Sequence, residues 1–120
     1  MAVQKIQAMN ISRRQLLAEH VLLADNFFKR LRGLLFTDSL PIGQGLLITP
    51  CNSIHAIGMT YTIDAIFLNK ENLVIATLAN LKPWHLSSIY WQARTCLELP
   101  AGTIANSGTM PGDQLQFTDY

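Results

Sequence analysis

The stretch from residue 45 to residue 68 reads GLLITPCNSIHAIGMTYTIDAIFL, and the rest of the chain is organised around it. It contains one of the two cysteines, one of the three histidines and an aspartate set in an apolar run, namely Cys51, His55 and Asp64. In residues 63–68 a period of two leaves both faces apolar except at Asp64. The pattern predicts a strand that is buried on both sides.

Asp64 is the residue in this stretch that most needs a physical explanation, because a buried aspartate is costly unless it is paired or hydrogen-bonded. In one interpretation its carboxylate accepts hydrogen bonds from backbone N–H groups of the turn at residues 58–62. In the other it pairs with an arginine in a pocket, and Arg30 is the natural candidate. Both interpretations predict that Asp64 is buried and paired.

Length and composition indicate one globular domain spanning residues 1–120. Of its residues 49% are hydrophobic and 14% are charged, which is enough apolar material for a core. The formal charge of +1 argues against a nucleic-acid partner, because such binders usually show a marked basic excess. No signal peptide is recognised and no apolar run approaches the about 20 residues of a membrane span, so we expect a cytoplasmic protein without a membrane partner. In that compartment Cys51 and Cys96 are expected to be free thiols.

Outward from the central stretch, short apolar runs alternate with turn residues. A helix is predicted over residues 26–32, capped by Asp25 or Asn26 at its start and by Gly33 at its end. The remaining elements are strands, predicted within 2–23 with a break at 10–14, at 46–49, at 63–68 and 73–81 joined by a hairpin, at 92–99 and at 114–117, with a compact connection over 100–108. This pattern predicts a mainly β fold, a small sandwich or barrel-like single domain with one principal short helix.

Several motifs follow one another at compatible spacing from about Ala24 onward. They are Arg30-x-x-Gly33-Leu34-Leu35, Gly45-Leu46-Leu47-Ile48, Pro50-Cys51-Asn52-Ser53-Ile54-His55, Met59, Ile63-Asp64-x-x-Phe67-Leu68, Leu97-Glu98-Leu99-Pro100-Ala101-Gly102 and Gly112-Asp113. Together they resemble the family known as domain of unknown function 192. The resemblance implies a compact, mainly β fold of small bacterial and archaeal proteins, some secreted and some cytoplasmic, and it implies no activity. Ala56 stands where that family commonly has threonine.

An enzyme or a metal site is one class of function to weigh. A Cys51–His55 pair would activate a thiol nucleophile, as in a hydrolase. On an extended chain, however, the two residues lie about 13 Å apart, four steps of roughly 3.3 Å. A metal site at Cys51 and His55 would need a distant ligand such as His85 or Cys96, and the sequence lacks the paired spacing of zinc motifs. We therefore assign no catalytic residue, no metal ligand and no cofactor.

The favoured interpretation is a non-catalytic binding or accessory module. Arg30, His55, Asp64 and Glu98 are isolated polar residues in apolar surroundings, and one small polar pocket lined by them would hold an unidentified small molecule or protein partner. The alternative is an internal network of these four residues that fastens the helix to the sheet.

Three aromatic residues follow the second strand of the hairpin. Trp84, Tyr90 and Trp91 are predicted to cover an edge of the core rather than to line the mouth of a ligand site.

Overall fold

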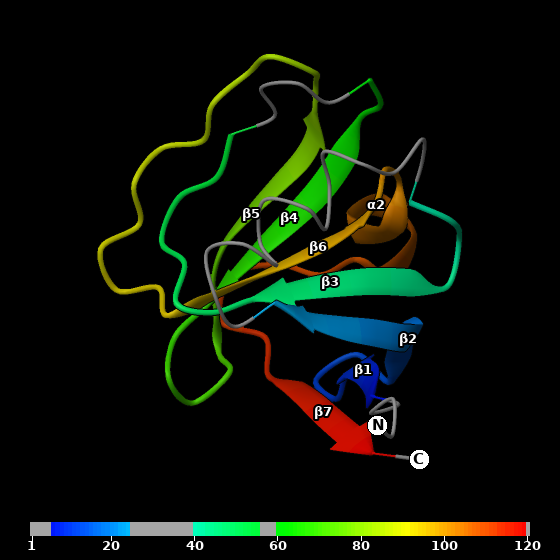
Figure 1. Cartoon of the computed structure of the whole chain (residues 1–120). Helices are drawn as coiled ribbons and strands as arrows, with labels where there is room; N and C mark the ends of the chain where they lie inside the picture. Colours follow the sequence, from blue (N-terminus) through cyan, green and yellow to red (C-terminus); the bar gives the residue numbers. More distant parts are fainter. Residues whose placement is uncertain (1–5, 25–39, 56–59, 120) are drawn as a thin grey trace.

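The computed structural model describes residues 6–24, 40–55 and 60–119, and these form one seven-stranded sheet that curls into a half-barrel (Figure 1). Its strands are β1 (Ile6–Asn10), β2 (Gln15–Ala24), β3 (Gln44–Ile48), β4 (Ile63–Leu68), β5 (Val74–Leu81), β6 (Thr95–Pro100) and β7 (Leu115–Asp119), in the spatial order β5-β4-β6-β3-β2-β1-β7. The predicted mainly β class is confirmed. The helix predicted at 26–32, with Arg30, lies outside the described residues.

The strand that the sequence predicted to be buried on both sides is β4, the second strand from one edge of the sheet. Every residue of β4 is buried. It pairs antiparallel with β5 through the predicted hairpin, whose turn is closed by the Asn69 side chain accepting hydrogen bonds from the Glu71 and Leu73 N–H groups. On its other side β4 pairs with β6, which comes later in the chain and inserts between β4 and β3. Two segments far apart in sequence, β4 and β6, therefore lie side by side in the sheet.

The sheet separates two apolar cores. The helix-side core includes Ile66, Leu68, Leu97 and Leu99, together with Ile104 of the short helix α2 (Thr103–Ser107). The loop-side core lies on the opposite face and includes Ile63, Ala65, Phe67, Ile48 and Cys96. Alternation along β4 and β6 thus sends neighbouring residues into different cores.

Helix α2 lies in the segment that the sequence predicted as a compact connection. It begins after Gly102 and ends at Gly108, whose φ values of 98° and 71° are in a region that side chains with a Cβ rarely adopt. The Gly108 N–H donates to the Ile104 carbonyl at 2.9 Å, which closes the helix after little more than one turn. The two glycines therefore set the length of α2.

Candidate functional site

The structure places three of the four predicted pocket residues, since Arg30 is outside the described residues. His55 is exposed and forms a backbone bridge to Leu86. Asp64 and Glu98 are both buried, on the adjacent strands β4 and β6. In the register of these strands Glu98 lies opposite Ala65, whereas Asp64 lies opposite Leu99, so their side chains project to opposite faces of the sheet. The structure does not turn Asp64 and Glu98 toward each other.

Asp64 projects to the helix side, where both carboxylate oxygens accept backbone hydrogen bonds. Oδ1 accepts from the Asn80 N–H at 2.9 Å, and Oδ2 accepts from the N–H groups of Gly102 at 3.1 Å and Ile104 at 2.9 Å. Asp64 is therefore buried and hydrogen-bonded as expected, but these three donors lie far along the chain rather than in the turn at 58–62. The carboxylate fastens β5 and the start of α2 to β4.

Glu98 projects to the loop side, and its side chain is buried there. It is 1% exposed, and among the described residues its Oε2 has no hydrogen-bond partner. Burial, and secondarily the neighbouring Cys51, raises the pKa of Glu98 well above its usual value. A buried polar atom without a partner is costly, so the position of Glu98 has no evident structural benefit.

Cys51 and Cys96 lie beside Glu98, and both are free thiols, as predicted. Cys96 on β6 is fully buried, and Cys51, just beyond β3, is half-buried with its thiol donating to the Ser53 carbonyl at 3.1 Å. Burial raises the pKa of the Cys96 thiol well above its usual value, and a hydrogen bond with the Cys51 thiol and the charge of Glu98 raise it further. No sequence motif indicates this cluster, because the pairing of β3 with β6 brings the three residues together.

Two connecting segments run side by side at the left of Figure 1, residues 49–55 and residues 82–94. The Ser87 N–H donates to the Ile54 carbonyl, the Ile54 N–H donates to the Ser87 hydroxyl, and the Tyr90 N–H donates to the Asn52 carbonyl. The Tyr90 ring also packs on Phe67 of the loop-side core, with ring centroids 4.6 Å apart. These contacts hold the segment 82–94 in a defined position against the sheet.

Four large apolar side chains of that segment are exposed. Trp84 and Leu86 are each 67% exposed, Ile89 is 51% exposed and Trp91 is 80% exposed. We call these four side chains the aromatic loop face. The prediction that the aromatic residues cover the core is thus confirmed for Tyr90 and wrong for the two tryptophans.

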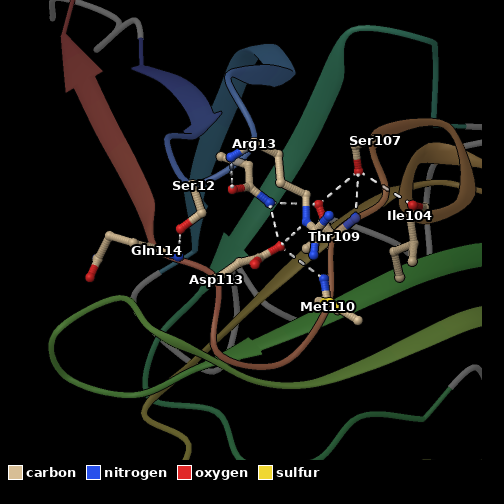
Figure 2. A network of polar contacts seen from close by, with 9 residues as sticks. Ser12, Arg13, Ile104, Ser107, Thr109, Met110, Asp113 and Gln114 are labelled. Atoms are coloured by element: carbon tan, nitrogen blue, oxygen red, sulfur yellow. Dashed lines mark hydrogen bonds and ion pairs between the residues drawn. The ribbon is translucent and has the colours of Figure 1, made fainter.

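A separate polar cluster ties the β1–β2 turn to the segment before β7 (Figure 2). Asp113 Oδ2 accepts hydrogen bonds from Asn10 Nδ2 at 3.0 Å, from Arg13 Nε at 2.6 Å and from the Met110 N–H at 3.0 Å. Asn10, fully buried, also donates to the Thr109 hydroxyl at 2.9 Å. Burial alone would raise the pKa of Asp113, but these hydrogen bonds and the Arg13 charge outweigh it, so that the pKa lies below its usual value.

Within the part of the chain that the structure describes, no three or more His, Cys, Asp or Glu side chains are grouped so as to hold a metal ion. No helix in that part is long and apolar enough to cross a bilayer.

Replacing Glu98 by methionine is expected to raise the free energy of unfolding at pH 7 by about 1–3 kcal/mol, because it removes a buried oxygen, Oε2, that has no hydrogen-bond partner in the described part of the chain. The pH dependence has a definite sign. With its pKa raised on folding, Glu98 keeps a proton in the folded state that the unfolded chain loses above pH about 4.3, so its contribution weakens stability as pH rises. Urea titrations should show the gap between Glu98→Met and the parent widening from pH 4 toward neutrality. A gap that does not change with pH would contradict this account.

This chain is similar to known proteins in sequence and in fold. A UPF0127 protein from Pyrococcus furiosus is 32% identical over 114 residues, which cover 91% of this chain and 96% of that protein. A UPF0127 protein from Pyrococcus horikoshii is 32% identical over 102 residues, covering 81% of this chain and 86% of the relative.

Two crystal structures share the fold at 21% identity and a TM-score of 0.78. One is a proposed transcription regulator from Sinorhizobium meliloti, matched over 95% of this chain and 92% of that one, and the other is a protein of unknown function from Novosphingobium aromaticivorans, matched over 92% and 82%. The model of the DUF192 family, described as "Uncharacterized ACR", matches residues 8–117. With this match and the similarity to the UPF0127 proteins, the chain belongs to the DUF192 family.

Proposed function

We propose that this protein is a non-catalytic binding module that engages a protein partner through the aromatic loop face beside His55. The observation that carries the proposal is the exposure of Trp84, Leu86, Ile89 and Trp91 within one short segment. Clustered apolar side chains on a surface mark interaction sites, and tryptophan is enriched among residues that dominate binding energy. His55 adjoins this face through its bridge to Leu86.

The chemistry of the segment indicates what kind of partner fits. Residues 82–94 include the exposed Lys82, His85 and Arg94 and no aspartate or glutamate. The complementary surface is therefore an apolar one with an acidic rim. Small molecules are usually enclosed by concave pockets, whereas side chains that are more than half exposed suit a broad protein surface.

The loop is also prepared for binding without a large loss of entropy. The Tyr90–Phe67 contact and the backbone bonds to Ile54 and Asn52 fix the segment in the free protein. Rigid aromatic groups bind with a smaller ordering cost than mobile ones. We place the module in the cytoplasm, as the sequence led us to expect.

The proposal is tested with a synthetic peptide that alternates leucine and aspartate, and with a second peptide in which lysine replaces each aspartate. The parent is expected to bind the acidic peptide at least about tenfold more tightly than the basic one, as measured by fluorescence anisotropy. Trp84→Ser/Trp91→Ser should lose at least about tenfold in affinity, because it removes the two largest apolar anchors. Ile42→Ser is the matched control, since Ile42 is 97% exposed but lies on another loop.

Equal binding of the two peptides, or equal binding by the parent and the double variant, would overturn the proposal. A thermal-shift screen of metabolites against the parent, His55→Ala and Trp84→Ser/Trp91→Ser addresses the small polar pocket predicted near His55. If a metabolite stabilises the parent and the tryptophan variant but not His55→Ala, the module binds a small molecule there and the protein-partner proposal is replaced.

A further inference from the structure

We infer that Cys51, Cys96 and Glu98 form a redox site for thiol–disulfide exchange with low-molecular-weight disulfides. In this site Cys51 is the attacking thiol, Cys96 is the resolving thiol and Glu98 accepts a proton. The inference does not depend on the aromatic loop face or on a protein partner.

The backbone brings the two sulfurs together on the loop side of the sheet. Cys96 lies opposite Ile48 in the β3–β6 ladder. Cys51 comes just after that pair, and its N–H donates to the Arg94 carbonyl at 2.8 Å, so the chain beyond β3 remains alongside β6. Both cysteines contribute to the loop-side core, and their thiols share a hydrogen bond. Neighbouring thiols of this kind are the starting geometry for an intramolecular disulfide.

The unequal burial of the two thiols assigns their order of reaction. Cys51 is half-buried and so is the thiol that an external disulfide can reach, whereas Cys96 has no exposed surface. A buried thiol beside a reachable one is suited to resolve a mixed disulfide rather than to form it.

Glu98 supplies the group that a buried resolving thiol needs. It follows Cys96 by two residues on the same strand, so both side chains project to the same face, with backbones about 7 Å apart. Its Oε2 has no hydrogen-bond partner among residues 6–24, 40–55 and 60–119, which leaves it open to accept a proton. A nucleophile with an adjacent base is the arrangement that thiol chemistry uses.

The reaction balances with the external disulfide as oxidant. The Cys51 thiolate attacks one sulfur of R–S–S–R, forming Cys51–S–S–R and releasing RS⁻, which takes up a proton from water. Glu98 enters the next step protonated: its Oε2, which has no hydrogen-bond partner among the described residues, takes up the Cys96 proton while the carboxyl gives up the proton it already holds. The Cys96 sulfur attacks the Cys51 sulfur, and the bond from Cys51 to the R–S group breaks. The second RS⁻ leaves and is protonated in turn by Glu98. The protein loses two protons and two electrons, which together are two hydrogen atoms, and one disulfide becomes two thiols.

The test uses the reduced full-length chain and glutathione disulfide as the probe, with acid quenching and intact-mass analysis over time. The parent is expected to lose two hydrogen atoms and to retain no adduct. Cys96→Ser should stop with one glutathionyl group on Cys51, and Cys51→Ser should stay unmodified. Cys96→Ala replaces Cys96→Ser if the hydroxyl prevents folding, and circular dichroism confirms the fold of each variant.

Glu98→Gln separates a role in proton transfer from a merely structural one. It should form the mixed disulfide at the parent rate but close the internal disulfide at least about tenfold more slowly, so that the Cys51 adduct accumulates. Closure at the parent rate would overturn the assignment of Glu98. A parent that gains two glutathionyl groups, or an adduct that maps to Cys96 in the parent, would overturn the redox site itself.

Discussion

Replacing Asp64 by alanine is expected to lower the free energy of unfolding by about 3–5 kcal/mol. The carboxylate is fully buried and satisfies three backbone N–H groups, from Asn80, Gly102 and Ile104. Alanine would leave one buried donor, from Ile104, and two part-buried donors without this acceptor, and each unsatisfied buried group costs about 1–3 kcal/mol. The loss would loosen two neighbouring elements from β4, because the donors belong to β5 and to the start of α2.

Urea unfolding followed by circular dichroism measures this effect. Asp64→Asn is the informative companion, since it keeps one acceptor oxygen but presents an NH₂ group to a backbone donor, and it should fall between the parent and the alanine variant. Glu71→Ala is the control, because Glu71 is exposed in the hairpin turn and its replacement should leave the midpoint unchanged. An Asp64→Ala midpoint equal to that of Glu71→Ala would show that the three hydrogen bonds do not stabilise the fold.

Asp113→Ala is expected to cost about 2–4 kcal/mol at neutral pH. It removes the acceptor for Asn10, Arg13 and the Met110 N–H at once, and the buried Asn10 Nδ2 would lose one of the two acceptors it has among the described residues and keep the Thr109 hydroxyl. The ion pair itself adds little, because the Arg13 side chain is 34% exposed and solvent screens it. Arg13→Met should therefore cost less than Asp113→Ala.

The acid dependence of this effect has the opposite sign to that of Glu98. The pKa of Asp113 is lowered on folding, so the unfolded chain binds its proton first and the stabilisation is complete only above pH about 4. It is lost as pH falls through the lowered pKa of the folded state. The stability difference between the parent and Asp113→Ala, measured by urea unfolding at a series of pH values, should shrink below pH 4. A difference that stays constant to pH 2 would contradict the proposed network.

The strands could be predicted because the sequence patterns that define them involve residues close together in the chain. Alternation in 63–68, the polar break at 69–72 and the interruption at 10–14 each depend on neighbouring residues, and the structure confirms the elements there. The pairing of β6 between β4 and β3 depends on contacts between distant segments, which no local pattern specifies.

The strand register, which the local sequence does not specify, determines the arrangement of the candidate site. One step along β4 or β6 transfers a side chain from one core to the other, so Asp64 and Glu98 can be adjacent in the sheet and yet be on opposite faces. The same register brings Cys96 to the cysteine near β3 and gives Glu98 its buried surroundings. The exposure of Trp84 and Trp91 could not be predicted from the sequence either, because an apolar residue in a loop packs inward or outward according to tertiary contacts.

The pairing of β1 with β7 has a consequence for how the chain is made. Ile6 lies opposite Asp119 and Asn10 opposite Leu115, so the first strand is completed by the last one. During synthesis one edge of the β1–β2 hairpin stays unpaired until residues 115–119 have left the ribosome, and contacts between such distant segments form slowly. The exposed edge of β1 is then the part of the nascent chain that most needs protection from pairing with another molecule.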